Sequence, residues 1–128
     1  MVDTLSPIRE VEVQLTRISD AIAEAVVAAS SDPGASPVLR AVFEELLRKS
    51  EATLTCMECE ERFCCFRERI VELEQAADSA KAAAVADEGA GELTQERILV
   101  AHEALRDLKG VVRRGLRCCE VLEQCCRS

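Results

Sequence analysis

The chain contains no Trp and no Tyr, and its only aromatic residues are Phe43, Phe63 and Phe66. Because β-sheets are enriched in aromatic residues, this scarcity argues against a sheet-based fold. Apolar residues still make up 48% of the 128 residues, so the hydrophobic core must be built from Leu, Val, Ile and Ala. This composition, together with a length that suits one core, predicts a single all-α domain spanning residues 1–128.

Long apolar segments are also missing. The best apolar stretch, residues 21–29, is interrupted by Glu24 and is too short to span a bilayer. The formal net charge of -8 disfavours binding to nucleic acids or anionic membranes, because phosphate contacts require clustered Lys and Arg. We therefore expect no nucleic acid and no membrane among the partners. Without a recognisable targeting segment, the expected location is cytoplasmic.

Residues that could form a catalytic site are scarce as well. The single histidine, His102, has no cysteine near it in the predicted helix pairing, the carboxylates are spread over polar faces, and no glycine-rich loop is present to bind phosphate. We therefore predict that the protein is not an enzyme. His102 lies at the edge of an apolar stripe, which is typical of a flanking or partly buried histidine rather than of a metal ligand.

The few glycines and prolines divide the chain into helical segments. Ser6-Pro7 and Ser36-Pro37 each combine an N-cap residue with a proline at the first helical position. The sequence Gly89-Ala90-Gly91 offers the left-handed and flexible conformations that commonly end a helix. Together with the apolar periodicity, these signals predict helices over residues 7–30, 37–53, 56–88 and 92–126.

The boundary between the second and third predicted helices has two interpretations. The apolar stripe changes face near Met57, and Thr55-Cys56-Met57-Glu58 matches a capping box, which favours a new helix starting at Cys56. Such a start would place Cys56 and Cys59 at the positive end of the helix dipole, where thiolates are stabilised. Alternatively, residues 37–88 form one continuous helix roughly 75 Å long, and the resulting rod would require a partner chain.

The last two predicted helices form a coiled-coil-like antiparallel hairpin. Each has apolar residues at alternating spacings of three and four, a pattern that packs one helix against another. The stripes are Cys56, Cys59, Phe63, Phe66, Ile70, Leu73, Ala77, Ala80 and Ala84 in one helix, and Ile98, Ala101, Leu105, Leu108, Val112, Gly115, Cys119, Leu122 and Cys126 in the other. Paired symmetrically about Gly91, they place Phe66 opposite Gly115. The predicted fold class is an all-α antiparallel bundle of three or four helices that includes this C-terminal hairpin.

The same pairing sorts all eight cysteines into two groups. One group contains Cys56, Cys59, Cys125 and Cys126, and the other contains Cys64, Cys65, Cys118 and Cys119. Each group is a predicted layer of four thiols, and the two layers lie roughly 12 Å apart along the hairpin. In a reducing compartment, grouped cysteines are more often metal ligands or redox groups than structural disulfides.

A layer of four thiols matches the coordination chemistry of a soft metal. Thiolates bind Cu(I) and Zn, and four of them suit a tetrahedral ion or an iron-sulfur cluster. We therefore predict a cysteine-rich metal-binding protein with a storage, sensing or carrier role. One alternative is a thiol-redox or disulfide-stapled interaction module that forms a homodimer. Another is inert packing, in which the cysteines serve as small apolar residues.

The substitution Gly115→Leu tests the predicted pairing of Phe66 with Gly115. A larger side chain should overpack the hairpin at a cost of about 1 to 3 kcal/mol, which exceeds a gain in helix propensity of under about 1 kcal/mol. We expect a lower melting temperature for the variant when thermal unfolding is followed by circular dichroism. A higher melting temperature would show that the pairing about Gly91 is wrong.

Overall fold

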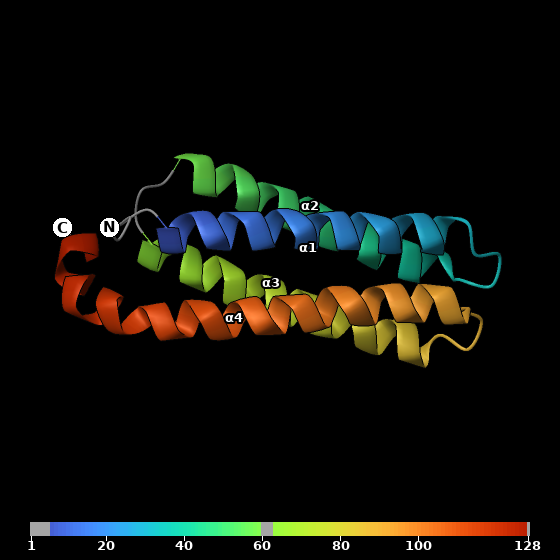
Figure 1. Cartoon of the computed structure of the whole chain (residues 1–128). Helices are drawn as coiled ribbons and strands as arrows, with labels where there is room; N and C mark the ends of the chain where they lie inside the picture. The colour runs from blue at the N-terminus through green and yellow to red at the C-terminus, as the bar shows by residue number, and fades with distance from the viewer. Residues whose placement is uncertain (1–5, 60–62, 128) are drawn as a thin grey trace.

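Helices make up nearly all of the chain that the structure describes (Figure 1). The computed structural model describes the backbone of residues 6–59 and 63–127, and the side chains of residues 10–55 and 68–112. Its helices are α1 (Ser6–Ser30), α2 (Pro37–Cys59), α3 (Phe63–Ala86) and α4 (Glu92–Arg127). The described residues contain no strand, and the predicted all-α class is confirmed.

The helices form a bundle in which each runs opposite to the one before it (Figure 1). α1 packs against α2 and α4, and α3 packs against the same two helices, so that the four surround a common core. This topology places the start of α1, the end of α2, the start of α3 and the end of α4 at one end of the bundle. The turns between α1 and α2 and between α3 and α4 lie together at the other end.

The limits of α2 correct one prediction from the sequence. The helix begins at Pro37, and the Ser36 hydroxyl caps it by accepting a hydrogen bond of 3.1 Å from the Leu39 amide. It continues to Cys59, so the predicted start of a new helix at Cys56 is wrong. The Thr55 hydroxyl donates to the Glu51 carbonyl at 3.1 Å, which is the bond of a residue inside a helix rather than of an N-cap.

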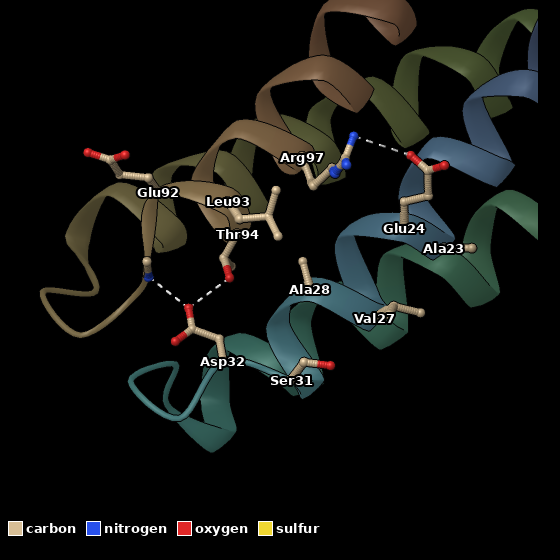
Figure 2. Close-up of a pocket in the computed structure, with 11 residues that line it drawn as sticks. Ala23, Glu24, Val27, Ala28, Ser31, Asp32, Glu92, Leu93, Thr94 and Arg97 are labelled. Carbon is tan, nitrogen blue, oxygen red and sulfur yellow. Dashed lines mark hydrogen bonds and ion pairs between the residues drawn. The ribbon is translucent and has the colours of Figure 1, made fainter.

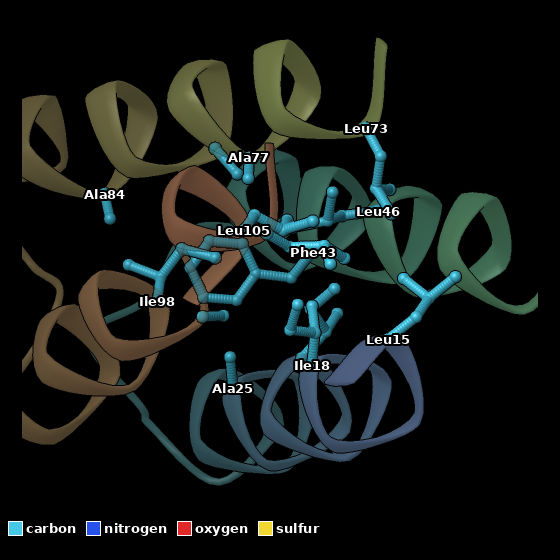
Figure 3. Packing of buried hydrophobic residues seen from close by; sticks show 14 of the residues in the cluster. Leu15, Ile18, Ala25, Phe43, Leu46, Leu73, Ala77, Ala84, Ile98 and Leu105 are labelled. Carbon is cyan, nitrogen blue, oxygen red and sulfur yellow. The ribbon is translucent and has the colours of Figure 1, made fainter. Parts of the chain in front are cut away.

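Each helix buries one apolar stripe in the core (Figure 3). The stripes predicted for the C-terminal hairpin are buried throughout the described side chains, from Ile70 to Ala84 in α3 and from Ile98 to Val112 in α4. Among the described side chains, Phe43 of α2 is the largest that is fully buried, and it lies in the centre of the bundle (Figure 3). Burial of these stripes is the main force that holds the four helices together.

Two polar contacts across α3 and α4 agree with the pairing about Gly91. The Lys109 ammonium lies 3.6 Å from a Glu74 carboxylate oxygen, and His102 Nε2 lies 3.4 Å from Asp78 Oδ1. Symmetric pairing about Gly91 matches residues of α3 and α4 that are equally far from Gly91 in the sequence. The partners in both contacts differ from such a match by at most two positions. The antiparallel register predicted for the hairpin therefore describes its middle section.

The two hairpins are structural repeats of one another. The turn residues Asp32, Gly34 and Ala35 correspond to Asp87, Gly89 and Ala90. The same offset matches the buried positions of the two hairpins: Leu15 with Ile70, Ile18 with Leu73, Ala25 with Ala80, Ala29 with Ala84, Phe43 with Ile98, and Leu46 with Ala101. Equivalent positions therefore face the core in both halves, and the hairpins are related by an approximate two-fold axis.

The two turns touch backbone to backbone at Gly34 and Gly89. A Cβ atom on either glycine would overlap the carbonyl oxygen of the other. None of the glycines in the described residues has a positive φ, so the left-handed conformation predicted near Gly89 and Gly91 is not formed. Glycine is required at Gly34 and Gly89 for this close approach, and not for backbone freedom.

Alanine at Gly34 or at Gly89 should therefore destabilise the protein. The two turns would have to separate, and overpacking of this kind costs about 1 to 3 kcal/mol. Denaturation with urea should show a similar loss for both variants, because the contact is reciprocal. Gly91→Ala is the control, since the nearest atom to its added Cβ is a side-chain oxygen of Asp32 at 3.2 Å. An equal loss in all three variants would contradict the proposed role of the turn contact.

Candidate metal centre

The cysteines fall on three helix ends at one end of the bundle. Cys56 and Cys59 lie in the last turn of α2, Cys64 and Cys65 lie in the first turn of α3, and Cys118, Cys119, Cys125 and Cys126 lie in the C-terminal part of α4. Figure 1 shows the green end of α2, the start of α3 and the red end of α4 at the same end of the molecule. Backbone segments that are distant in the sequence are thus neighbours here.

The backbone changes the expected grouping of the cysteines. The prediction that Cys56 and Cys59 form a layer with Cys125 and Cys126 required Cys56 to begin the helix that pairs with α4. Cys56 and Cys59 instead end α2, which runs opposite to α3 and is joined to it by residues 60–62 alone. The last turn of α2 therefore lies level with the first turn of α3, which contains Cys64 and Cys65.

The antiparallel pairing of α3 and α4 places part of α4 at the same level. Cys65 and Cys118 are equally far from the contact between Glu74 and Lys109, in opposite directions along antiparallel helices. Three helix segments, from α2, α3 and α4, therefore bring six cysteine positions to one level of the backbone. The grouping into two layers of four is replaced by one level of six.

The remaining pair, Cys125 and Cys126, lies beyond this level. α4 has 36 residues whereas α3 has 24, and the turn at which α3 ends is the turn from which α4 starts. The last turns of α4 therefore extend past the start of α3 (Figure 1). Cys125 is seven residues after Cys118, which corresponds to roughly 10.5 Å along the helix.

The side chains of all eight cysteines lie outside those that the structure describes, and so does the predicted contact between Phe66 and Gly115. Their metal-binding role stays a prediction. Within the described side chains, no group of three or more His, Cys, Asp or Glu residues could hold a metal ion.

The helix dipoles at this end also differ from expectation. Because Cys56 and Cys59 end α2, their backbone lies at the negative end of that helix and not at the positive end of a new one. The positive end belongs to α3, whose first turn contains Cys64 and Cys65. Any stabilisation of a thiolate by a helix N-terminus applies to these two positions.

His102 is buried between α3 and α4, away from the cysteine end. Its Nε2 atom lies 3.4 Å from Asp78 Oδ1 and 4.0 Å from Glu74 Oε1, and the second oxygen of Glu74 lies 3.6 Å from Lys109. Glu74 thus lies between His102 and Lys109, and Asp78 lies beside His102, in the hairpin groove. The prediction that His102 flanks the apolar stripe agrees with this position.

A groove of about 670 Å³ lies between α1 and α4 at the turn end of the bundle (Figure 2). Its apolar surface includes Val27 and Leu93, which are 64% and 54% exposed. An ion pair of 3.6 Å between Arg97 and Glu24 crosses it. At its end, Asp32 Oδ2 accepts hydrogen bonds of 2.7 Å from both the Gly91 amide and the Thr94 hydroxyl.

Asp32 and Asp87 bind the two turns to each other. Asp32 accepts from Gly91 and Thr94 of the second hairpin, and Asp87 Oδ2 accepts a bond of 3.0 Å from the Ser36 amide of the first. The second oxygen of each carboxylate accepts from an amide of its own turn. This pair of reciprocal interactions is called the turn clasp below.

Hydrogen bonding changes the acidity of both clasp residues. Bonds from the Gly91 amide, the Thr94 hydroxyl and the Gly34 amide lower the pKa of Asp32. Bonds from the amide and hydroxyl of Ser36 lower the pKa of Asp87, although the nearby carboxylate of Asp32 opposes this shift. Both carboxylates are therefore stabilised in their charged form by folding.

The turn clasp was not predicted above, although the sequence contains a signal for it. The pattern Asp-x-Gly-Ala occurs in both turns, at Asp32 and at Asp87. An internal repeat of this kind indicates duplicated supersecondary structure. The repeat does not reveal by itself that each aspartate binds the opposite turn, because that depends on how the hairpins pack.

Comparison with known proteins gives no relative. No family model, no curated protein and no solved structure matches the chain. Over the residues that the structure describes, none of the helices combines the length and the apolar character needed to cross a membrane.

Replacing both clasp residues in Asp32→Asn/Asp87→Asn should remove a pH-dependent part of the stability. Because folding lowers both pKa values, this part is fully present above the unfolded-state pKa of about 3.9 and is lost as the pH falls through the folded-state pKa values. Urea denaturation should show a large difference between wild type and variant at pH 7, and a smaller one below about pH 4. A difference that does not change with pH would contradict this account.

Proposed function

We propose that the protein binds a soft metal ion or an iron-sulfur cluster through thiolates at the cysteine end of the bundle. The proposal is supported above all by the bundle topology, which brings three cysteine-bearing helix ends together. Cysteines spread from Cys56 to Cys126 in the sequence share one end of a molecule whose other end contains none. Thiolates from different helices are the ligands that Cu(I), Zn and iron-sulfur clusters use.

The level of six cysteine positions is the proposed centre. Cys56 and Cys59 of α2, Cys64 and Cys65 of α3, and Cys118 and Cys119 of α4 offer more donors than the four of one tetrahedral ion or cluster. Cys64 and Cys65 differ by about 100° around a helix, as do Cys118 and Cys119, so we do not expect all six residues to serve as ligands of one ion. We propose that four thiolates, drawn from the three helices, complete the coordination.

A binding role, such as storage, sensing or transport of the metal in the cytoplasm, accounts for the remaining features better than catalysis. His102, the single histidine, is engaged with Asp78 and Glu74 in the hairpin groove. A metal bound to folded helices would also stabilise the bundle, because the bound state contributes its binding free energy to folding.

A thiol-redox or disulfide-stapled module is the second candidate. It is favoured by the position of Cys64 and Cys65 in the first turn of α3, because a helix N-terminus stabilises a reactive thiolate. Disulfides between α2, α3 and α4 would join helix ends that the bundle already brings together. This candidate predicts few free thiols in protein isolated without reductant.

Elemental analysis and a thiol count on the same anaerobic preparation separate the two candidates. We expect at least one soft metal ion per chain, and eight free thiols after denaturation with a chelator. Brown colour with visible absorbance would identify an iron-sulfur cluster rather than Cu(I) or Zn. Metal-free protein with fewer free thiols would support the disulfide candidate instead.

Two matched double variants test the position of the centre. Cys118→Ser/Cys119→Ser removes the pair of α4 that is level with α2 and α3, whereas Cys125→Ser/Cys126→Ser removes the pair beyond them. We expect the first variant to lose most of its bound metal and the second to retain at least about half, because sites that share no ligands behave independently. Circular dichroism should show that both remain helical. Loss of all metal in the second variant alone would contradict a centre at this level.

A further inference from the structure

The connection between α2 and α3 differs in sequence from the other two turns. The turn between α1 and α2 contains Asp32-Pro33-Gly34, and the turn between α3 and α4 contains Asp87, Gly89 and Gly91. From residue 54 to residue 67, by contrast, the sequence contains no Gly, Pro, Asn or Asp. Its central residues, Glu60-Glu61-Arg62, have high helix propensity. The sequence thus favours helix at a point where a single bundle requires a reversal.

The helix ends on either side are also poorly marked. The last turn of α2 contains no basic residue, and the first turn of α3 contains no acidic residue. Charges of those signs would stabilise a helix C-terminus and N-terminus, respectively. The acid Glu58 instead lies at the negative end of α2. Neither end therefore has the features that would favour ending a helix there.

The contacts between the two hairpins do not depend on this connection. In the turn clasp, Asp32 accepts from Gly91 and Thr94, and Asp87 accepts from Ser36, so each bond joins one hairpin to the other. The Gly34–Gly89 contact and the buried stripes are reciprocal in the same way. All of these contacts would form equally well between hairpins of two different chains.

We propose that the protein also assembles as a hairpin-exchanged dimer with a second copy of itself. In this dimer α2 and α3 form one continuous helix, and the α1–α2 hairpin of each chain packs on the α3–α4 hairpin of the other. Each of the two bundles keeps the core and the clasp of the single chain, so the exchange loses no packing. The dimer goes beyond the proposed function and does not require a bound metal.

The exchange brings the cysteine ends of two bundles together. Cys56, Cys59, Cys64 and Cys65 lie on both sides of the connection, so they occupy the middle of the continuous helix. The two chains cross between the bundles at this point. Cysteine positions of both chains therefore meet in the centre of the dimer, where one chain supplies donors beside those of the other.

The test compares full-length wild type with two variants of the connection, in reductant and chelator to exclude disulfide and metal bridges. Glu60→Asn/Glu61→Gly introduces a strong reverse-turn sequence. Glu60→Ala/Glu61→Ala removes the same two charges but keeps high helix propensity. Molar mass is measured by light scattering after gel filtration over a range of concentrations. We expect dimers for wild type and the alanine variant, and a dissociation constant raised at least tenfold for the turn variant.

The shape of the wild-type dimer gives a second measurement that needs no variant. A continuous helix over residues 37–86 would be about 75 Å long, whereas the longest helix of the single bundle, α4, is about 54 Å. Small-angle X-ray scattering should therefore show a particle at least about 75 Å long. A wild type that stays monomeric at all concentrations overturns the proposal, as does a dimer no longer than one bundle or one that the turn variant does not weaken.

Discussion

The contact between the two turns fixes the position of each hairpin along the bundle axis relative to the other hairpin. Gly34 and Gly89 meet without room for a side chain, and Asp32 and Asp87 each bind amides of the opposite turn. Apolar stripes alone would tolerate sliding of one hairpin against the other, because burial of apolar area is not directional. Reciprocal hydrogen bonds are directional, so the clasp selects one position. The level of the helix ends at the far end of the bundle follows from this position.

The repeat preserves which positions are buried more closely than it preserves the character of their side chains. In the first hairpin, Ser19 and Ser50 form a buried hydrogen bond of 3.1 Å between α1 and α2. The corresponding positions in the second hairpin are Glu74 and Leu105, and Glu74 lies near His102 and Lys109 instead. The same backbone arrangement therefore accepts either a small neutral pair or ionisable side chains at these positions. Buried positions also change in character between the halves, since Leu39 corresponds to Thr94 and both are buried.

The cysteine end has no counterpart in the repeat. The positions of the first hairpin that correspond to Cys64 and Cys65 are Arg9 and Glu10, and α4 extends beyond α2 by 13 residues if both are counted from their first residue. The cysteine positions thus depart from the approximate symmetry of the two hairpins. Both the proposed metal centre and the proposed exchange involve this asymmetric end, whereas stability resides mainly in the symmetric core and clasp.

The sequence by itself determined the local features of this protein. Ser36 and Pro37 mark the start of α2, and the alternating spacing from Ile70 to Ala84 and from Ile98 to Val112 identifies two buried stripes, because a cap or a helical face depends only on neighbouring residues. The tertiary structure alone decided that α2 ends at Cys59 opposite the start of α3, that Asp32 binds Gly91, and that three cysteine-bearing segments share one level. These outcomes depend on how the two hairpins pack on each other, and the pattern within one helix or one hairpin does not specify which residues of the other hairpin it meets.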